Sequence, residues 1–162
     1  MSKITKAFGL AACLLAVPAT LAVVTLTADN APRLAFSGGV MHAVGWIAVF
    51  ALLLMDVVAV QIALPGPPSA ALGDLFVRIM NSSTVIALNI LATFHLVGGI
   101  VLGIAIWKTP GFPRWAALIW IVGGPVHFLS NINGMLLVDE LTWIALIAAN
   151  IPVIQLLGQN SN

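Results

Sequence analysis

Five long apolar runs separated by short polar segments constrain this chain more than any other feature of its sequence. A helix needs about 20 predominantly apolar residues to cross the hydrocarbon core of a bilayer, and inside lipid each backbone polar group must be paired within the segment. Long apolar runs are therefore expected to be helices. The runs cover residues 7–27, 39–64, 81–107, 115–130 and 141–157. The sequence predicts an all-α integral membrane protein, a bundle of five transmembrane helices in one domain that comprises residues 1–162.

Composition supports lipid as the main solvent of this chain. Of its residues 61% are hydrophobic and 7% are charged, whereas a soluble globular domain carries about 25% charged residues. The formal net charge is +1, and the Lys and Arg residues stand singly in loops and at chain ends. Because nucleic-acid binding needs a basic patch or stripe, this distribution excludes it. The expected surroundings are membrane lipid, with multi-pass insertion into a membrane whose identity is open.

The first run has two interpretations. Lys3 and Lys6 precede it, as in the charged start of a secretory signal peptide. The run is long for a signal core, so we expect it to be retained as a helix. If it is cleaved, the bundle has four helices.

Polar segments between the runs predict how neighbouring helices are connected. The second run stops at Pro65 in a Pro-Gly-Pro-Pro turn, and a polar connector with Ser69, Asp74 and Arg78 follows. Residues 81–83, Asn-Ser-Ser, offer capping side chains for the start of the third run.

The turn at residues 108–114 contains two prolines and is short, so the third and fourth runs are expected to be antiparallel neighbours. Residues 123–125, Gly-Gly-Pro, should kink or loosen the fourth run. Asp139 and Glu140 are expected just before the fifth run, where carboxylates favour a helix start. Three tryptophans near run ends, at the depth of the interfacial aromatic belt, support these boundaries: Trp107, Trp115 and Trp143.

Orientation in the membrane stays open. With the amino terminus inside, three cations fall on each side, so the positive-inside rule gives a tie. These are Lys3, Lys6 and Arg78 against Arg33, Lys108 and Arg114.

Ionisable residues at membrane depth are the best indication of a site, because they are costly there unless they face a cavity or a partner. The candidates are Asp56, His42, His95 and His127. His95 precedes Trp107 by twelve residues and His127 follows Trp115 by twelve, which places both about 18 Å below the shared turn. Two histidines at equal depth on adjacent helices can face each other.

Further polar residues share helix faces with these candidates by their spacing of three or four residues. On the second run the stripe is His42, Trp46, Val49, Leu53 and Asp56. On the fourth run it is Trp120, Gly124, His127 and Asn131. Asn89 and Asn150 add amides at central depth, where a bond to a neighbouring helix is their more common role.

These residues predict a membrane-embedded enzyme that performs acid/base chemistry, an isomerisation or cyclisation, on a lipophilic small molecule. Histidine and buried carboxyl groups can both act as acid or base near neutrality. The expected catalytic residues are Asp56, His95 and His127. The expected substrate-binding residues are His42, Trp46, Asn89, Trp120, Asn131 and Asn150.

Other functions remain open. One is an accessory or structural subunit of a larger membrane complex, or a homo-oligomer, in which the polar groups only join helices. Another is a b-type haem or pigment protein with the histidine pair as axial ligands, although neighbouring helices lie close and no Cys-x-x-Cys-His motif is present. Transport has thin support, since no paired broken-helix repeat is visible. The histidines lack metal-ligand spacing, so we expect no metal and no cofactor, with haem as the exception.

Overall fold

The computed structural model describes residues 3–63 and 70–160. This part of the chain is helical almost throughout and contains no strand. In order, its helices are α1 (Lys3–Thr27), α2 (Pro32–Ala63), α3 (Ala70–Met80), α4 (Ser83–Ala92), α5 (Phe94–Lys108), α6 (Arg114–Ile132), α7 (Leu136–Ala149) and α8 (Ile151–Asn160). Five stretches are long and apolar enough to cross a membrane: Leu10–Thr27, Pro32–Val60, Ser83–Lys108, Arg114–Ile132 and Leu136–Gln159. The predicted all-α bundle with five membrane-spanning segments is confirmed.

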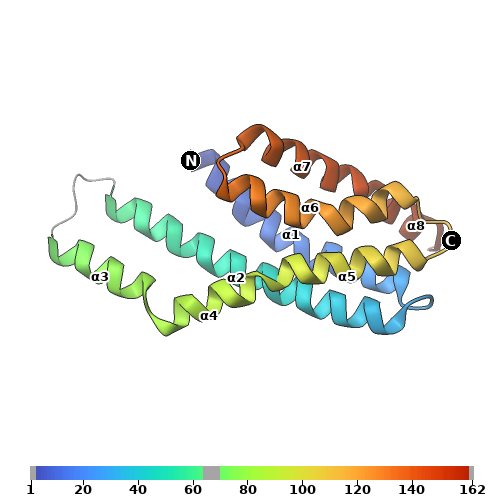
Figure 1. Cartoon of the computed structure of the whole chain (residues 1–162), viewed down its shortest axis with the longest axis horizontal. Coiled ribbons are helices and arrows are strands. Elements are labelled where there is room, and N and C mark those ends of the chain that lie inside the picture. Colours follow the sequence, from blue (N-terminus) through green and yellow to red (C-terminus); the bar gives the residue numbers. More distant parts are fainter. Residues whose placement is uncertain (1–2, 64–69, 161–162) are drawn as a thin grey trace.

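The helices form two layers that meet along α5 (Figure 1). In one layer α1 packs along α2, and in the other α7 packs along α6, while α5 contacts both α2 and α6. The far end of α2, together with α3, extends past the turn that joins α6 to α7 (Figure 1). The two layers therefore lie side by side over only part of the length of α2.

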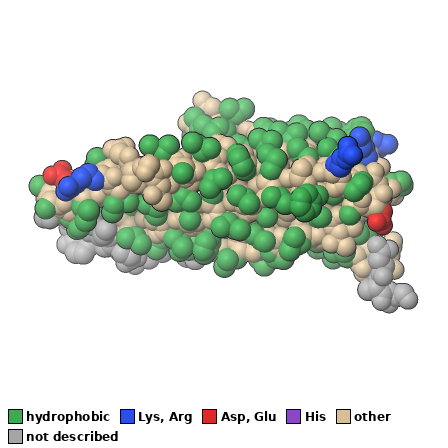
Figure 2. Space-filling model, turned by 90° about the horizontal axis from the view of Figure 1, so that it is seen from below, with side chains coloured by type: hydrophobic (Ala, Val, Ile, Leu, Met, Phe, Trp, Pro, Cys, Tyr) green, Lys and Arg blue, Asp and Glu red, His purple; other side chains and the backbone are tan. Residues whose placement is uncertain are grey.

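The outer surface suits lipid. Large apolar side chains are exposed on every helix from α1 to α8. Figure 2 shows them spread along the length of one face, with charged side chains near the two ends. This is the distribution expected when hydrocarbon covers the middle of a bundle and water its ends.

Several helix boundaries differ from the sequence prediction. α2 begins at Pro32, seven residues earlier than expected, because proline suits the first position of a helix. The expected connector after the second run is the helix α3, whose residues are amphipathic rather than simply polar. α7 begins at Leu136, so Asp139 lies in its first turn and not before it. The expected Pro-Gly-Pro-Pro turn and Ser69 lie outside the described residues.

The internal breaks also differ. The third run divides into α4 and α5 at Thr93, while the fourth continues through residues 123–125 as one helix, α6. The fifth run divides at Asn150, two residues before Pro152. The predicted cap of the third run is present: the Ser82 side chain accepts a hydrogen bond of 3.3 Å from the backbone N–H of Val85.

Two of the three tryptophans expected at the interface are exposed at one end of the α5–α6 helix pair. Trp107 and Trp115 are exposed beside the turn between α5 and α6, and the Arg114 guanidinium stacks 4.7 Å from the centre of the Trp107 ring. The expectation for Trp143 is wrong. α7 begins earlier than predicted, and Trp143 turns inward from its second turn to line a cavity.

Candidate functional site

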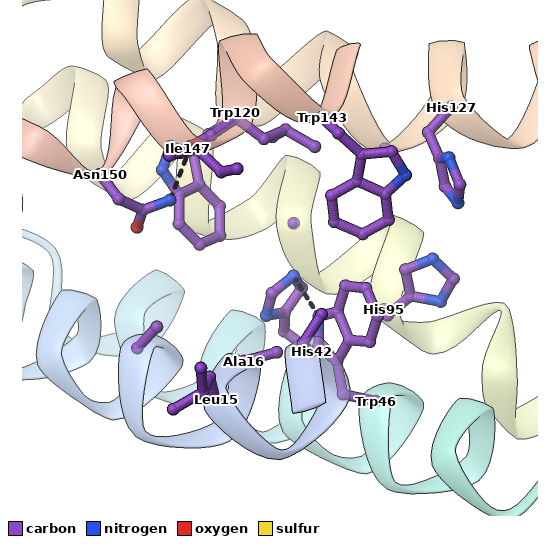
Figure 3. Close-up of a pocket in the computed structure, with 15 residues that line it drawn as sticks. Leu15, Ala16, His42, Trp46, His95, Trp120, His127, Trp143, Ile147 and Asn150 are labelled. Atoms are coloured by element: carbon purple, nitrogen blue, oxygen red, sulfur yellow. Dashed lines mark hydrogen bonds between the residues drawn. The ribbon is translucent and has the colours of Figure 1, made fainter. Parts of the chain in front are cut away.

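A cavity of about 340 Å³ lies between the two layers, with α1 and α2 on one side and α6 and α7 on the other (Figure 3). Its wall is predominantly apolar, and rings make up much of it. The lining residues are Ala12, Leu15, Ala16, Ala19, His42, Trp46, His95, Gly99, Trp120, Gly124, His127, Trp143, Leu146, Ile147 and Asn150. All three histidines of the chain thus meet at one cavity.

His42 has a hydrogen-bond partner at each ring nitrogen. The indole N–H of Trp46 donates to Nε2 at 3.1 Å, so Nε2 carries the lone pair. Nδ1 lies 2.7 Å from Thr20 Oγ1, and the Thr20 hydroxyl proton is already donated to the Ala16 carbonyl oxygen at 2.7 Å. Nδ1 must therefore be the donor to Thr20. His42 is held as the neutral Nδ1–H tautomer, with no ring nitrogen left for a ligand.

His95 sits at the break between α4 and α5. Its Nδ1 is hydrogen-bonded to the carbonyl oxygen of Ala92, which can only accept, so Nδ1 carries the proton. The backbone N–H of Leu96 donates to the Thr93 carbonyl oxygen, three residues back, at 3.1 Å. The imidazole thus satisfies a carbonyl at the helix break. Nε2 is left with its lone pair.

His127 on α6 is paired with a carboxylate from α7. Its Nδ1 is hydrogen-bonded to Asp139 Oδ1, and the Ser130 hydroxyl lies 3.3 Å from the same oxygen. The carboxylate accepts a hydrogen bond from Nδ1 and so fixes the orientation of the ring. With Nδ1 directed at Asp139, the other nitrogen of His127 is Nε2.

The three histidines bond the protein in the same way through Nδ1 but differ in whether Nε2 is available. Each uses Nδ1 to bond a protein acceptor. Nε2 of His42 is occupied by Trp46, whereas Nε2 of His95 and of His127 makes no hydrogen bond within the part of the chain that the structure describes. His95 and His127 lie together at one end of the cavity, close enough to interact electrostatically (Figure 3).

Aromatic rings surround these two histidines. The Trp46 ring packs against His95 with centroids 5.0 Å apart, and Trp143 packs edge-on against His127 at 4.8 Å. The two indoles are 6.0 Å apart. At the other side of His42 lies the buried Trp120, whose indole N–H has no acceptor among the described residues.

The cavity reaches the outer surface between α1 and α7. Leu15 on α1 and Ile147 on α7 line it, although their side chains are 67% and 68% exposed. Each of these helices packs mainly on its own layer, α1 on α2 and α7 on α6. Both exposed residues lie within stretches that are long and apolar enough to span a membrane, which is the part of such a bundle that hydrocarbon surrounds.

The structure brings six of the residues singled out from the sequence to the cavity wall: His42, Trp46, His95, Trp120, His127 and Asn150. The Asn150 amide also donates a hydrogen bond of 2.7 Å to the Leu146 carbonyl oxygen. His95 and His127 were expected at equal depth below the turn between the third and fourth runs, and they lie at the same end of the cavity (Figure 3).

Three further candidates lie away from the cavity, with exposed side chains. Asp56 lies on α2 fourteen residues beyond His42, about 21 Å further along the helix axis, and does not line the cavity. Asn89 lies on α4, before the helix break at Thr93, and its amide bonds the Val85 carbonyl oxygen at 2.9 Å. Asn131 lies in the last turn of α6, beyond the end of the cavity wall.

Asp139 and Trp143 are site residues that the sequence reasoning did not include. A signal for Asp139 existed. It follows His127 by twelve residues, and the turn at Asn133 and Gly134 lies midway between them. In a tight antiparallel helix pair, residues equidistant from the turn come to the same level, so this spacing indicates a pair.

The described residues contain no group of three or more His, Cys, Asp or Glu side chains arranged to hold a metal ion. The two available nitrogens on their own make an incomplete ligand set for a structural or catalytic metal, which takes three or four protein ligands.

Comparison with known proteins gives no match: no family model fits this chain, and no curated protein or solved structure is detectably similar to it. What the site can do therefore follows from its own geometry.

Proposed function

We propose that this protein is a membrane-embedded enzyme that moves protons on a lipophilic substrate, in an isomerisation or cyclisation. The observation that carries the proposal is the pair of available Nε2 atoms at one end of an apolar, lipid-facing cavity, on His95 and His127. Such a cavity with a few convergent polar groups is the common form of a small-molecule site.

The two histidines have opposite roles in this proposal. His95 is neutral with its proton on Nδ1, so its Nε2 is a base. His127 bonds the Asp139 carboxylate through Nδ1, and in this proposal its ring also carries a proton on Nε2, which makes that Nε2–H the acid. A base and an acid facing one substrate allow a proton to leave one atom while another arrives elsewhere, without a change in redox state. Asp139 is a positioning residue, since it acts through His127.

Solvent exchange tests this function even while the substrate is unidentified. Purified protein in nanodiscs is incubated in D₂O with a lipid extract of the source membranes, and deuterium in the recovered lipids is measured by mass spectrometry. An enzyme that abstracts and returns protons labels its substrate with deuterium. We expect labelling with the wild-type protein, and a decrease of about 10² to 10⁴-fold in His95→Gln and His127→Gln.

Adjacent carboxylates on α7 give a matched control. Asp139→Asn removes the charge that holds His127, whereas Glu140→Gln makes the same change at an exposed neighbour that does not line the cavity. Labelling should fall in the first variant and persist in the second. Full labelling in both histidine variants overturns the proposal, as does loss of labelling in Asp56→Asn alone, which would place the chemistry on the far part of α2. Absence of labelled lipid, with a fixed set of co-purifying proteins, favours the structural-subunit function.

A b-type haem or pigment is the second candidate, and one observation favours it: the two nitrogens that remain for axial ligation are both Nε2 atoms in the same cavity. An absorbance spectrum of protein purified from its native membrane distinguishes the two. A Soret band that disappears in His95→Gln and His127→Gln supports haem ligation, and a spectrum without that band supports the enzyme.

A further inference from the structure

The strengths of the acid and base at this site restrict what the substrate can be. Imidazole has a pKa near 6.5 in water, so it is too weak a base to deprotonate an unactivated carbon and its conjugate acid is too weak to protonate a simple alkene. A carbonyl group next to the carbon removes this obstacle, because the electron pair left by the proton is delocalised onto oxygen. A hydrogen-bond donor aimed at that oxygen stabilises the developing charge further.

Resting on the proposed function, we infer that the substrate is a lipophilic ketone with a C–H bond next to the carbonyl. The His127 Nε2–H donates to the carbonyl oxygen, and the His95 Nε2 takes the proton from the adjacent carbon. The C–H electron pair becomes a carbon–carbon double bond, and the carbonyl π electrons move to oxygen, which receives the His127 proton. The enol then returns that proton to His127 and accepts the His95 proton at the same or a conjugated carbon. Atoms and electrons balance, and no oxidant or reductant takes part.

The electrostatics of the pair fit a neutral carbonyl rather than an ionic head group. In the proposed form, with His127 protonated at both ring nitrogens, its charge is balanced by the Asp139 carboxylate that it bonds, so the pair has no net charge. Among the residues that the structure describes, no other charged side chain lines the cavity. An anionic or cationic head group would have to leave water without a partner charge, at a cost of several kcal/mol per ion.

The volume and opening of the cavity indicate the size and form of the ligand. A volume of about 340 Å³ corresponds to roughly eleven water-sized units at about 30 Å³ each, which is enough for a ring and a few further atoms. The rings of Trp46 and Trp143 already pack with the two histidines at 4.8 to 5.0 Å, and a planar or cyclic head group continues this packing. A longer tail would leave through the opening at Leu15 and Ile147 into lipid.

Infrared spectroscopy tests carbonyl binding separately from turnover. The probe is 4-heptylcyclohexanone with ¹³C at the carbonyl, added to the full chain in nanodiscs. We expect its C=O stretch to move to lower frequency on binding to wild type and to Glu140→Gln. In His127→Leu and Asp139→Asn the stretch should match that in empty nanodiscs, with folding checked by circular dichroism. An unshifted stretch in the wild-type protein overturns the inference.

Exchange at the neighbouring carbon tests the base. In D₂O the wild-type protein should exchange the protons next to the probe carbonyl, and His95→Gln should lose about 100-fold or more of that rate while keeping the shifted stretch. A shifted stretch with no exchange by wild type contradicts the proposed function but leaves the carbonyl site standing. Deuterium found in the membrane extract only in lipids without a carbonyl contradicts the ketone and leaves the proposed function standing.

The route from lipid has a matched pair of variants on α7. Ile147 and Ile144 are both strongly exposed, at 68% and 63%, but only Ile147 lines the cavity. Ile147→Trp should narrow the opening and slow exchange of the probe, whereas Ile144→Trp should leave the rate unchanged. Equal rates in the two variants contradict access between α1 and α7.

Discussion

Gly45 on α2 lies directly against the backbone of His95 on α5: a Cβ atom on Gly45 would come within 2.1 Å of the His95 amide nitrogen. The relation is repeated in reverse, since a Cβ on Gly98 would come within 2.3 Å of the amide nitrogen of His42. Each glycine stands three residues after the histidine of its own helix. Two helices that touch at glycines can approach backbone to backbone. This contact brings His42 and His95 to the same cavity.

Adding a methyl group at either glycine should force α2 and α5 apart. We expect Gly45→Ala and Gly98→Ala to lower the free energy of unfolding by about 1–3 kcal/mol or more, as overpacking does elsewhere. Thermal denaturation in detergent micelles measures this loss of stability. Gly73→Ala on α3 is the control: nothing lies within 4 Å of a Cβ there, and alanine favours the helix, so its stability should be unchanged or higher. Equal stability of all three variants would show that the close approach is absent.

The bond from His42 to Thr20 gives a second prediction, with a control on the same helix. Thr20 and Thr25 each donate to the carbonyl oxygen four residues back, at 2.7 and 2.9 Å, but only Thr20 also accepts from His42. Thr20→Val leaves the buried Nδ1–H of His42 without an acceptor, which should cost about 1–3 kcal/mol of unfolding free energy. Thr25→Val loses only the helix-internal bond at an exposed position. A cost in chemical denaturation that is the same for both would contradict the tautomer assigned to His42.

The membrane-spanning segments were predictable because each needs about 20 predominantly apolar residues, and the length of an apolar run is visible in the sequence. The spans found at Pro32–Val60 and Ser83–Lys108 overlap the predicted runs over most of their length. Boundaries were harder, since Pro32 extends α2 by two turns through residues that are not all apolar. The helix α3 was missed as well, because its polar residues stand among apolar ones and the segment was interpreted as a polar connector.

The site was only partly predictable, because a residue lines the cavity only if its helix is rotated to face it and the neighbouring helices extend to its level. His95 and His127 could be paired from their distance to one short turn. Asp56 shares a helix face with His42 by its spacing but does not line the cavity, because it lies fourteen residues, about 21 Å, further along α2. Asp139 contacts His127 from the other side of the turn between α6 and α7. Hydropathy marks Asp139 only as a polar residue at the end of an apolar run, and it does not show that the two residues are equally far from that turn.

Asp56 should be accessible to water at the edge of the membrane. It follows Pro32 by 24 residues, about 36 Å along the helix axis, whereas the hydrocarbon core is about 30 Å thick. Cys13 is the only cysteine, so a Cys13→Ala chain provides a clean background for single cysteines. In membranes, Asp56→Cys should react with a charged maleimide.

Ile47→Cys is the control for this labelling. Ile47 is 59% exposed on the same helix, but about 22 Å from Pro32, at hydrocarbon depth. It should stay unlabelled in membranes and react after solubilisation in a denaturing detergent. Asp56→Cys that is as unreactive as Ile47→Cys would place Asp56 within the hydrocarbon.

The hydrogen bonds assign proton positions that nuclear magnetic resonance can read. With ¹⁵N-labelled histidine, His42 and His95 should both appear as neutral rings protonated at Nδ1, because Thr20 and the Ala92 carbonyl accept there. Trp46→Phe removes the donor to His42 Nε2, so the ¹⁵N resonance of that nitrogen should shift while Nδ1 remains protonated. Trp107→Phe, at the exposed end of α5, should change neither ring. A wild-type His42 protonated at Nε2 would reverse the assignment, free its Nδ1 as an acceptor, and leave the Trp46 indole without its partner.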